Sequence, residues 1–116
     1  MANQERGEAP LVVGSKTYTL VFTFDAACEA QSLLDMGLPE IFASLEPASL
    51  RLPVLRAILW AALQRHHPEM DLVATGKLAG EAGLPKIVNA LGSALTEAEW
   101  LVAATGNTAR PRKAAR

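Results

Sequence analysis

The fold is decided by the stretch Leu11-Val12-Val13-Gly14-Ser15-Lys16-Thr17-Tyr18-Thr19-Leu20-Val21-Phe22. It holds two runs of strand-favouring residues around a short glycine-containing turn, and we expect a β-hairpin that turns at Gly14-Ser15-Lys16. The second run places Tyr18, Leu20 and Phe22 on one apolar face. Since an isolated hairpin is only marginally stable in water, we expect it to pack on helices or to gain strands from a partner.

Helical patterns fill the chain after the hairpin. We expect the first helix to be capped by Thr23 or Asp25 and to end at Gly37, where a left-handed glycine can stop it. Prolines and glycines separate the helices that follow. Their boundaries are predicted at Pro39 and Pro47 for a short helix, Pro53 and Pro68 for the third, Asp71 and Ala82 for the fourth, and Pro85 and Val102 for the last.

These elements predict an α+β fold: an N-terminal β-hairpin followed by four to five mostly antiparallel helices, with a disordered basic C-terminal tail. We expect one domain over residues 9–104 and flexible termini at residues 1–8 and 105–116. The spacing of Gly76, Gly80 and Gly83 is expected to serve close helix packing and a helix end. The single cysteine, Cys28, is expected to be a small core residue.

Composition narrows the class of protein. Among the 116 residues, 11 basic and 12 acidic side chains give a formal net charge of −1, whereas a general nucleic-acid binder normally carries a basic excess. We therefore expect no nucleic-acid partner. No apolar run approaches the roughly 18 residues needed to cross a bilayer, and no secretory signal is recognisable, so we expect a cytoplasmic protein without a membrane partner.

The sequence offers no recognisable catalytic, cofactor or metal motif. Gly76-Lys77 resembles the end of a phosphate-binding loop, but Leu78 replaces the required Ser or Thr and Asp71 replaces the first Gly. The adjacent His66 and His67 point roughly 100° apart on a helix, so they are expected to form a polar helix end rather than a metal site. We expect a protein that is not an enzyme and that binds no cofactor or metal.

Two further features have a structural and a functional interpretation. Residues 77–88 resemble a helix-turn-helix with its turn at Gly83, but Asn89 stands where an apolar residue is usual and the second helix carries a single lysine. Trp60 is expected in the core. Trp100 lies at the edge of its apolar face and is either partly buried or an anchor for a partner.

The order of several soft motifs resembles a known family. Asn3-x-x-Arg6-Gly7-Glu8 precedes the hairpin, whose end reads Tyr18-Thr19-Leu20-x-Phe22-x-Phe24-x-Ala26. A Leu-rich segment over residues 52–63, then Glu81-Ala82-Gly83-Leu84 and an Ala/Leu helix, complete the likeness over roughly residues 3 to 103. The chain is similar to the small tail proteins of gene transfer agents and tailed phages, classed as tail assembly chaperones and also labelled tail tube proteins.

The resemblance implies a non-enzymatic assembly chaperone in a bacterial cell that makes phage-like particles. Its partners would be the helical tape measure protein and the tail tube protein, with a possible homo-oligomer through the hairpin edge. The residues expected to contact partners are Tyr18, Leu20, Phe22, Trp60 and Trp100. Two alternatives stay open: a structural tail tube or tail-end component of the particle, and a small DNA-binding regulator that uses residues 77 to 95.

Overall fold

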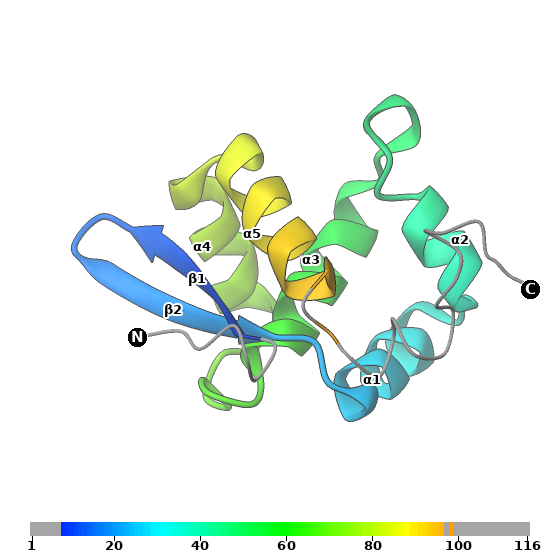
Figure 1. The fold of residues 1–116 in the computed structure, drawn as a ribbon, viewed down its shortest axis with the longest axis horizontal. Coiled ribbons are helices and arrows are strands. Elements are labelled where there is room, and N and C mark those ends of the chain that lie inside the picture. The colour runs from blue at the N-terminus through cyan, green and yellow to red at the C-terminus, as the bar shows by residue number, and fades with distance from the viewer. Residues whose placement is uncertain (1–7, 97, 99–116) are drawn as a thin grey trace, which may run out of the picture.

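The computed structural model describes residues 8–96 and residue 98. Two strands precede the helices. In chain order the elements are β1 (Glu8–Val13), β2 (Lys16–Val21), α1 (Phe24–Leu34), α2 (Leu38–Ala43), the 3₁₀ helix η2 (Pro47–Ser49), α3 (Leu52–Leu63), α4 (Leu72–Ala82) and α5 (Leu84–Thr96). The predicted α+β fold, a hairpin followed by a helical body, is confirmed (Figure 1). The basic C-terminal tail lies outside the described residues.

The hairpin closes with a two-residue turn. Val13 pairs with Lys16 in an antiparallel register, so Gly14 and Ser15 alone form the loop and the expected three-residue turn is wrong. Gly14 has a φ of 62°, which a glycine at the first loop position adopts without strain and which suits the right-handed twist of a hairpin. At the other end β1 begins at Glu8, a buried residue that we expected in the flexible N-terminus.

One face of the hairpin covers the helices. Leu11 on β1 and Leu20 on β2 are buried, together with Phe22 just after β2. This face packs on α5, which contacts both strands, and on α3, which contacts β2. The turn of the hairpin projects beyond the helices (Figure 1). The hairpin is thus stabilised mainly by packing on the helical body, which is one of the two ways of stabilising it that the sequence predicted.

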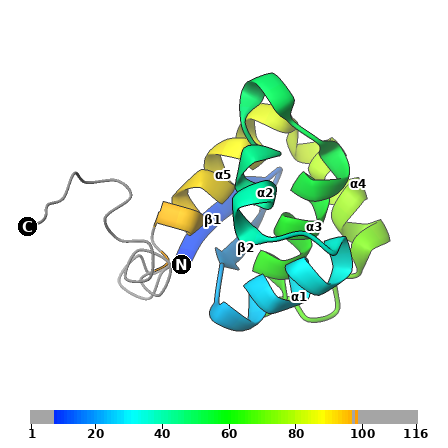
Figure 2. The same ribbon diagram turned by 90° about the vertical axis from the view of Figure 1, so that its right-hand side faces the viewer.

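Helix α3 is the centre of the helical body. Eight of its 12 residues are buried, and α1, α4, α5 and β2 all contact it. Figure 2 shows α3 among the other helices. Its core side chains are aliphatic, with Ile58, Leu59 and Leu63 fully buried. Burial of such side chains contributes roughly 1.5–3 kcal/mol each, so this helix contributes substantially to stability.

Helix α1 begins after Thr23, one of the two predicted caps, but it ends at an aspartate rather than at the predicted glycine. The Thr23 hydroxyl accepts a hydrogen bond of 2.9 Å from the Ala26 backbone N–H, so Thr23 is the N-cap. The helix ends at Asp35, whose φ of 55° is left-handed, and the prediction that Gly37 ends it is wrong. Aspartate tolerates this conformation better than most residues. The backbone N–H of Gly37 instead donates to the Glu40 carboxylate and begins α2.

The buried face of α1 is built from alanines, and Cys28 is not part of it. Ala26, Ala27 and Ala30 are buried against the core, whereas Cys28 is exposed. Cys28 follows Ala26 by two residues, which on a helix is a rotation of about 200° to the opposite face. The expectation of a core cysteine is therefore wrong.

The connection from α3 to α4 starts earlier than Pro68 predicts. Helix α3 ends at Leu63. The side-chain amide of Gln64 donates to the backbone carbonyl oxygens of Trp60 at 3.1 Å and Met70 at 2.9 Å. These two bonds fold the loop back on the helix end. Asp71 then caps α4, because its carboxylate accepts the Ala74 N–H at 2.8 Å. The loop so fixed carries His66 and His67.

Candidate functional site: an apolar helix groove and the hairpin edge

An apolar groove of about 470 Å³ runs between α3 and the junction of α4 with α5. Helix α3 supplies one wall, α4 supplies small residues, and the start of α5 closes one side. The lining residues are Leu52, Pro53, Leu55, Arg56, Leu59, Gly76, Ala79, Gly80, Gly83, Leu84 and Ile87. Arg56 is the one charged residue among them, and no acidic residue lines the groove.

The groove is open because α4 turns its smallest residues toward it. Gly76, Ala79, Gly80 and Gly83 recur at three- and four-residue steps, so they share one face of the helix. A Cβ built on Gly80 would meet no atom within 4 Å. The expectation that Gly80 serves close packing is therefore wrong: its missing side chain leaves a groove.

The other two glycines on this face have different surroundings. A Cβ on Gly76 would meet only the Arg56 side chain, at 3.5 Å, which is an ordinary contact distance. Gly83 has a φ of 91°, and its backbone N–H donates to the Ala79 carbonyl, so it ends α4 as predicted. A side chain at this φ would be strained, which explains glycine at the junction of α4 and α5.

Large apolar side chains are exposed at the groove. Leu52 at the start of α3 is 60% exposed, and Leu84 at the start of α5 is 44% exposed. Val73 on α4 and Val88 on α5 are also exposed, and each lies on the same side of its helix as the lining residues. Together with the lining residues they form an exposed apolar surface, which makes the groove a candidate binding site.

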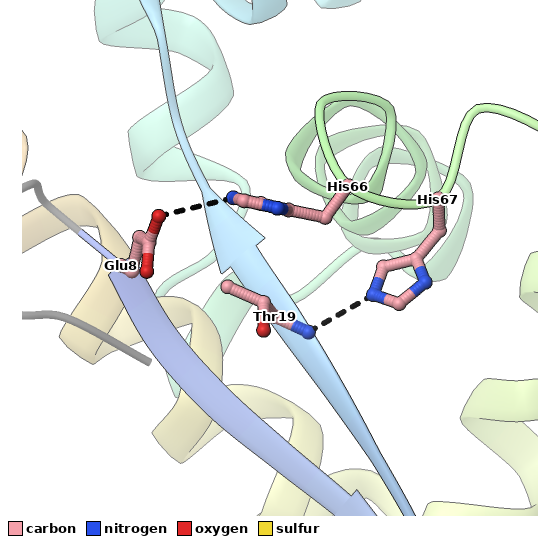
Figure 3. Close-up of polar contacts among 4 residues, drawn as sticks. All are labelled: Glu8, Thr19, His66 and His67. Carbon is pink, nitrogen blue, oxygen red and sulfur yellow. Dashed lines mark hydrogen bonds and ion pairs between the residues drawn. The ribbon is translucent and has the colours of Figure 1, made fainter. Parts of the chain in front are cut away.

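A second candidate region lies where the loop after α3 meets the hairpin. The His66 Nε2 atom lies 3.1 Å from a Glu8 carboxylate oxygen on β1. The His67 Nε2 atom accepts a hydrogen bond of 3.1 Å from the Thr19 backbone N–H on β2. Figure 3 shows the two imidazoles reaching different strands. The histidines thus hold the hairpin, a role that the sequence interpretation as a polar helix end missed.

Burial lowers the pKa of His67 below its ordinary value of 6.5. The nearby Glu69 carboxylate acts in the opposite direction and His66 acts in the same direction, both more weakly than the desolvation of the ring. The Tyr18 ring covers part of the imidazole, with ring centroids 5.2 Å apart. A neutral imidazole is also the form that the Thr19 contact requires, because Nε2 must carry a lone pair.

The residues expected to contact partners are not gathered on one surface. Leu20 and Phe22 are 0% and 1% exposed, so they belong to the core and are covered in this structure. Tyr18 and Trp60 are half-buried and pack against that core. Trp100 lies outside the described residues. The apolar groove, which the sequence analysis did not identify, has the exposed side chains of Leu52 and Leu84 at its edges.

The helix-turn-helix interpretation corresponds to α4, Gly83 and α5. The two helices are separated by Gly83 alone, and Asn89 is exposed. Leu84 and Val88, on the exposed side of α5, are apolar. A recognition helix would need polar and basic side chains for base edges and phosphates.

Over residues 8–96 and 98, no group of three or more His, Cys, Asp or Glu side chains is placed to hold a metal ion. The helices of the same part of the chain are all too short or too polar to cross a bilayer. No family model, curated protein or solved structure matches this chain. The tail-protein resemblance therefore stays a prediction.

Proposed function

We propose that this protein is a non-enzymatic tail assembly chaperone of phage-like particles, which binds an amphipathic helix of the tape measure protein in the groove between α3 and α4–α5. The observation that carries the proposal is the open apolar groove itself, with exposed Leu52 and Leu84 at its edges. Helix-in-groove binding places an apolar helix face against such a surface. The tail tube protein is the second partner that the resemblance implies.

The occupant that fits this groove is a helix with carboxylates beside its apolar face. Arg56 lines the groove without an acidic partner among the described residues. Helices α3 and α5 both begin at the groove, and neither has an acidic residue in its first turn. Since helix N-termini carry partial positive charge, both ends favour an anionic group nearby. The groove would thus orient an acidic amphipathic helix.

The chemistry of the lining favours a helix over a small polar ligand. Pockets for small ligands have volumes of roughly 300–1,000 Å³ and combine apolar walls with a few converging polar groups. This groove has the volume, but Arg56 is the one polar side chain in its lining. An extended apolar surface with one cationic edge matches the face of an amphipathic helix.

The experiment is co-expression with a tape measure protein of a phage-like particle, followed by affinity capture and size-exclusion chromatography. We expect a complex and an increased soluble fraction of the tape measure protein. Arg56→Glu should weaken the complex, and the loss should shrink at high salt because the contact is partly electrostatic. No complex with the unchanged protein would overturn the proposal. Retention of the protein in purified particles would favour the structural-component alternative.

A further inference from the structure

The outer edge of β2 carries a backbone donor that a histidine covers. Val13 and Lys16 flank the two-residue turn, so they form a hydrogen-bonded pair, and such pairs alternate along an antiparallel ladder. Thr19, opposite Pro10, is therefore in a non-hydrogen-bonded position with its N–H directed away from β1. Pro10 has no N–H at all. His67 accepts the Thr19 N–H, which is otherwise available to an added strand.

We propose that His67 is a pH-sensitive cap on the β2 edge, closed while its imidazole is neutral and opened when the imidazole takes up a proton. A protonated imidazole has N–H donors on both nitrogens and no lone pair for Thr19. The Thr19 N–H would then face solvent or the backbone of another strand. This device is independent of the groove and of the proposed function.

The neighbouring histidine holds the other strand of the hairpin. The His66 Nε2 atom lies 3.1 Å from a Glu8 carboxylate oxygen on β1. This contact does not involve the Thr19 N–H, so the His67 bond can open while β1 stays attached to the loop. The two contacts join the loop after α3 to different strands, as Figure 3 shows.

The titratable groups around His67 come from both elements that meet there. Tyr18 on β2 lies against the ring, and His66 and Glu69 flank it on its own loop. Burial, which outweighs the Glu69 charge, keeps the pKa of His67 below its ordinary value. The cap is accordingly closed near neutral pH. The predicted homo-oligomer through the hairpin edge would require the cap to open.

Residue-resolved hydrogen exchange of the Thr19 amide tests the proposal. Protection factors, corrected for intrinsic exchange, should fall at Thr19 relative to Ile58 in the core as the pH decreases from about 7 to about 5. His67→Phe keeps a ring against Tyr18 but has no acceptor, so Thr19 protection should fall about three- to tenfold already at neutral pH. His67→Gln keeps an acceptor that does not titrate, and it should remove the pH dependence.

Nitrogen shifts of the imidazole provide a second readout that does not depend on stability. At neutral pH the Nε2 of His67 should have the shift of an unprotonated nitrogen and Nδ1 that of a protonated one. Equal Thr19 protection in the wild type and His67→Phe would overturn the proposal. So would a Thr19 pH dependence that persists in His67→Gln, or a proton on Nε2 at neutral pH.

Discussion

The His67 imidazole accepts the backbone N–H of Thr19 across 48 residues of sequence, at 3.1 Å. The contact fastens the strand that carries Leu20 and Tyr18 to the loop that follows the central helix α3. With the His66–Glu8 contact beside it, both strands of the hairpin are bound to one short loop. This explains how a two-stranded sheet that is marginal by itself takes a fixed position on the helices.

Folding stability should depend on pH through His67. Its pKa is lower in the folded protein than its ordinary value of 6.5, so the unfolded chain binds more protons below about pH 6.5. The contribution of this group is therefore fully present above that pH and is lost as the pH falls through the folded pKa. Urea denaturation at about pH 7 and about pH 5.5 should show a larger loss for the wild type than for His67→Gln.

Thr75→Val should stabilise the protein. Thr75 is fully buried on α4, and its hydroxyl has no hydrogen-bond partner among the described residues. Valine has the same shape and a similar helix propensity, so the change removes the cost of an unsatisfied buried group, about 1 kcal/mol. Thermal unfolding should show a Tm increase of about 4–8 °C. An unchanged or lower Tm would mean that the hydroxyl is satisfied.

Leu20→Ala should destabilise the fold, because Leu20 is a core residue. Removal of a fully buried leucine side chain costs about 2–5 kcal/mol in the free energy of unfolding. Val12→Ala on the neighbouring strand is the control: Val12 is 46% exposed, and its loss should cost less than about 1 kcal/mol. Similar small costs for both variants would instead support the sequence-based prediction that Leu20 contacts a partner.

Gly80 and Gly83 should respond to alanine in opposite directions, because Gly80 has a helical backbone and Gly83 has a positive φ. Gly80 is helical with open space around its Cα, so Gly80→Ala should stabilise by about 1 kcal/mol through helix propensity. Gly83, three residues later, has a φ of 91°, so Gly83→Ala should destabilise by about 1–3 kcal/mol. Chemical denaturation of both variants measures the sign directly.

The strand and helix types followed from the sequence, whereas several ends did not. Alternating apolar residues predicted β2, and Asp71 with Gly83 bounded α4 correctly. At the end of α1 two residues could take the left-handed conformation, and Asp35 took it although glycine is the usual choice. Such a choice depends on how the next helix packs, which local propensities do not describe.

The candidate site was harder to predict than the fold. Glycines at helical spacing allow either close packing or an open groove, and the sequence at Gly80 does not distinguish the two. The histidine contacts join residues 48 and 58 positions apart, so no local spacing reveals them. Leu20 and Phe22 are large apolar residues of the kind that anchor partners, but the helices beneath the hairpin cover them.

The most direct test of the central claim fills the groove without disturbing the fold. Gly80→Leu places a side chain into open space, and Gly92→Leu on α5 is a matched control, since a Cβ there also meets nothing within 4 Å and lies outside the lining. Both variants should unfold at or above the wild-type temperature. We predict that co-purification of the tape measure protein is lost in Gly80→Leu and kept in Gly92→Leu; equal capture by a well-folded Gly80→Leu would contradict the account.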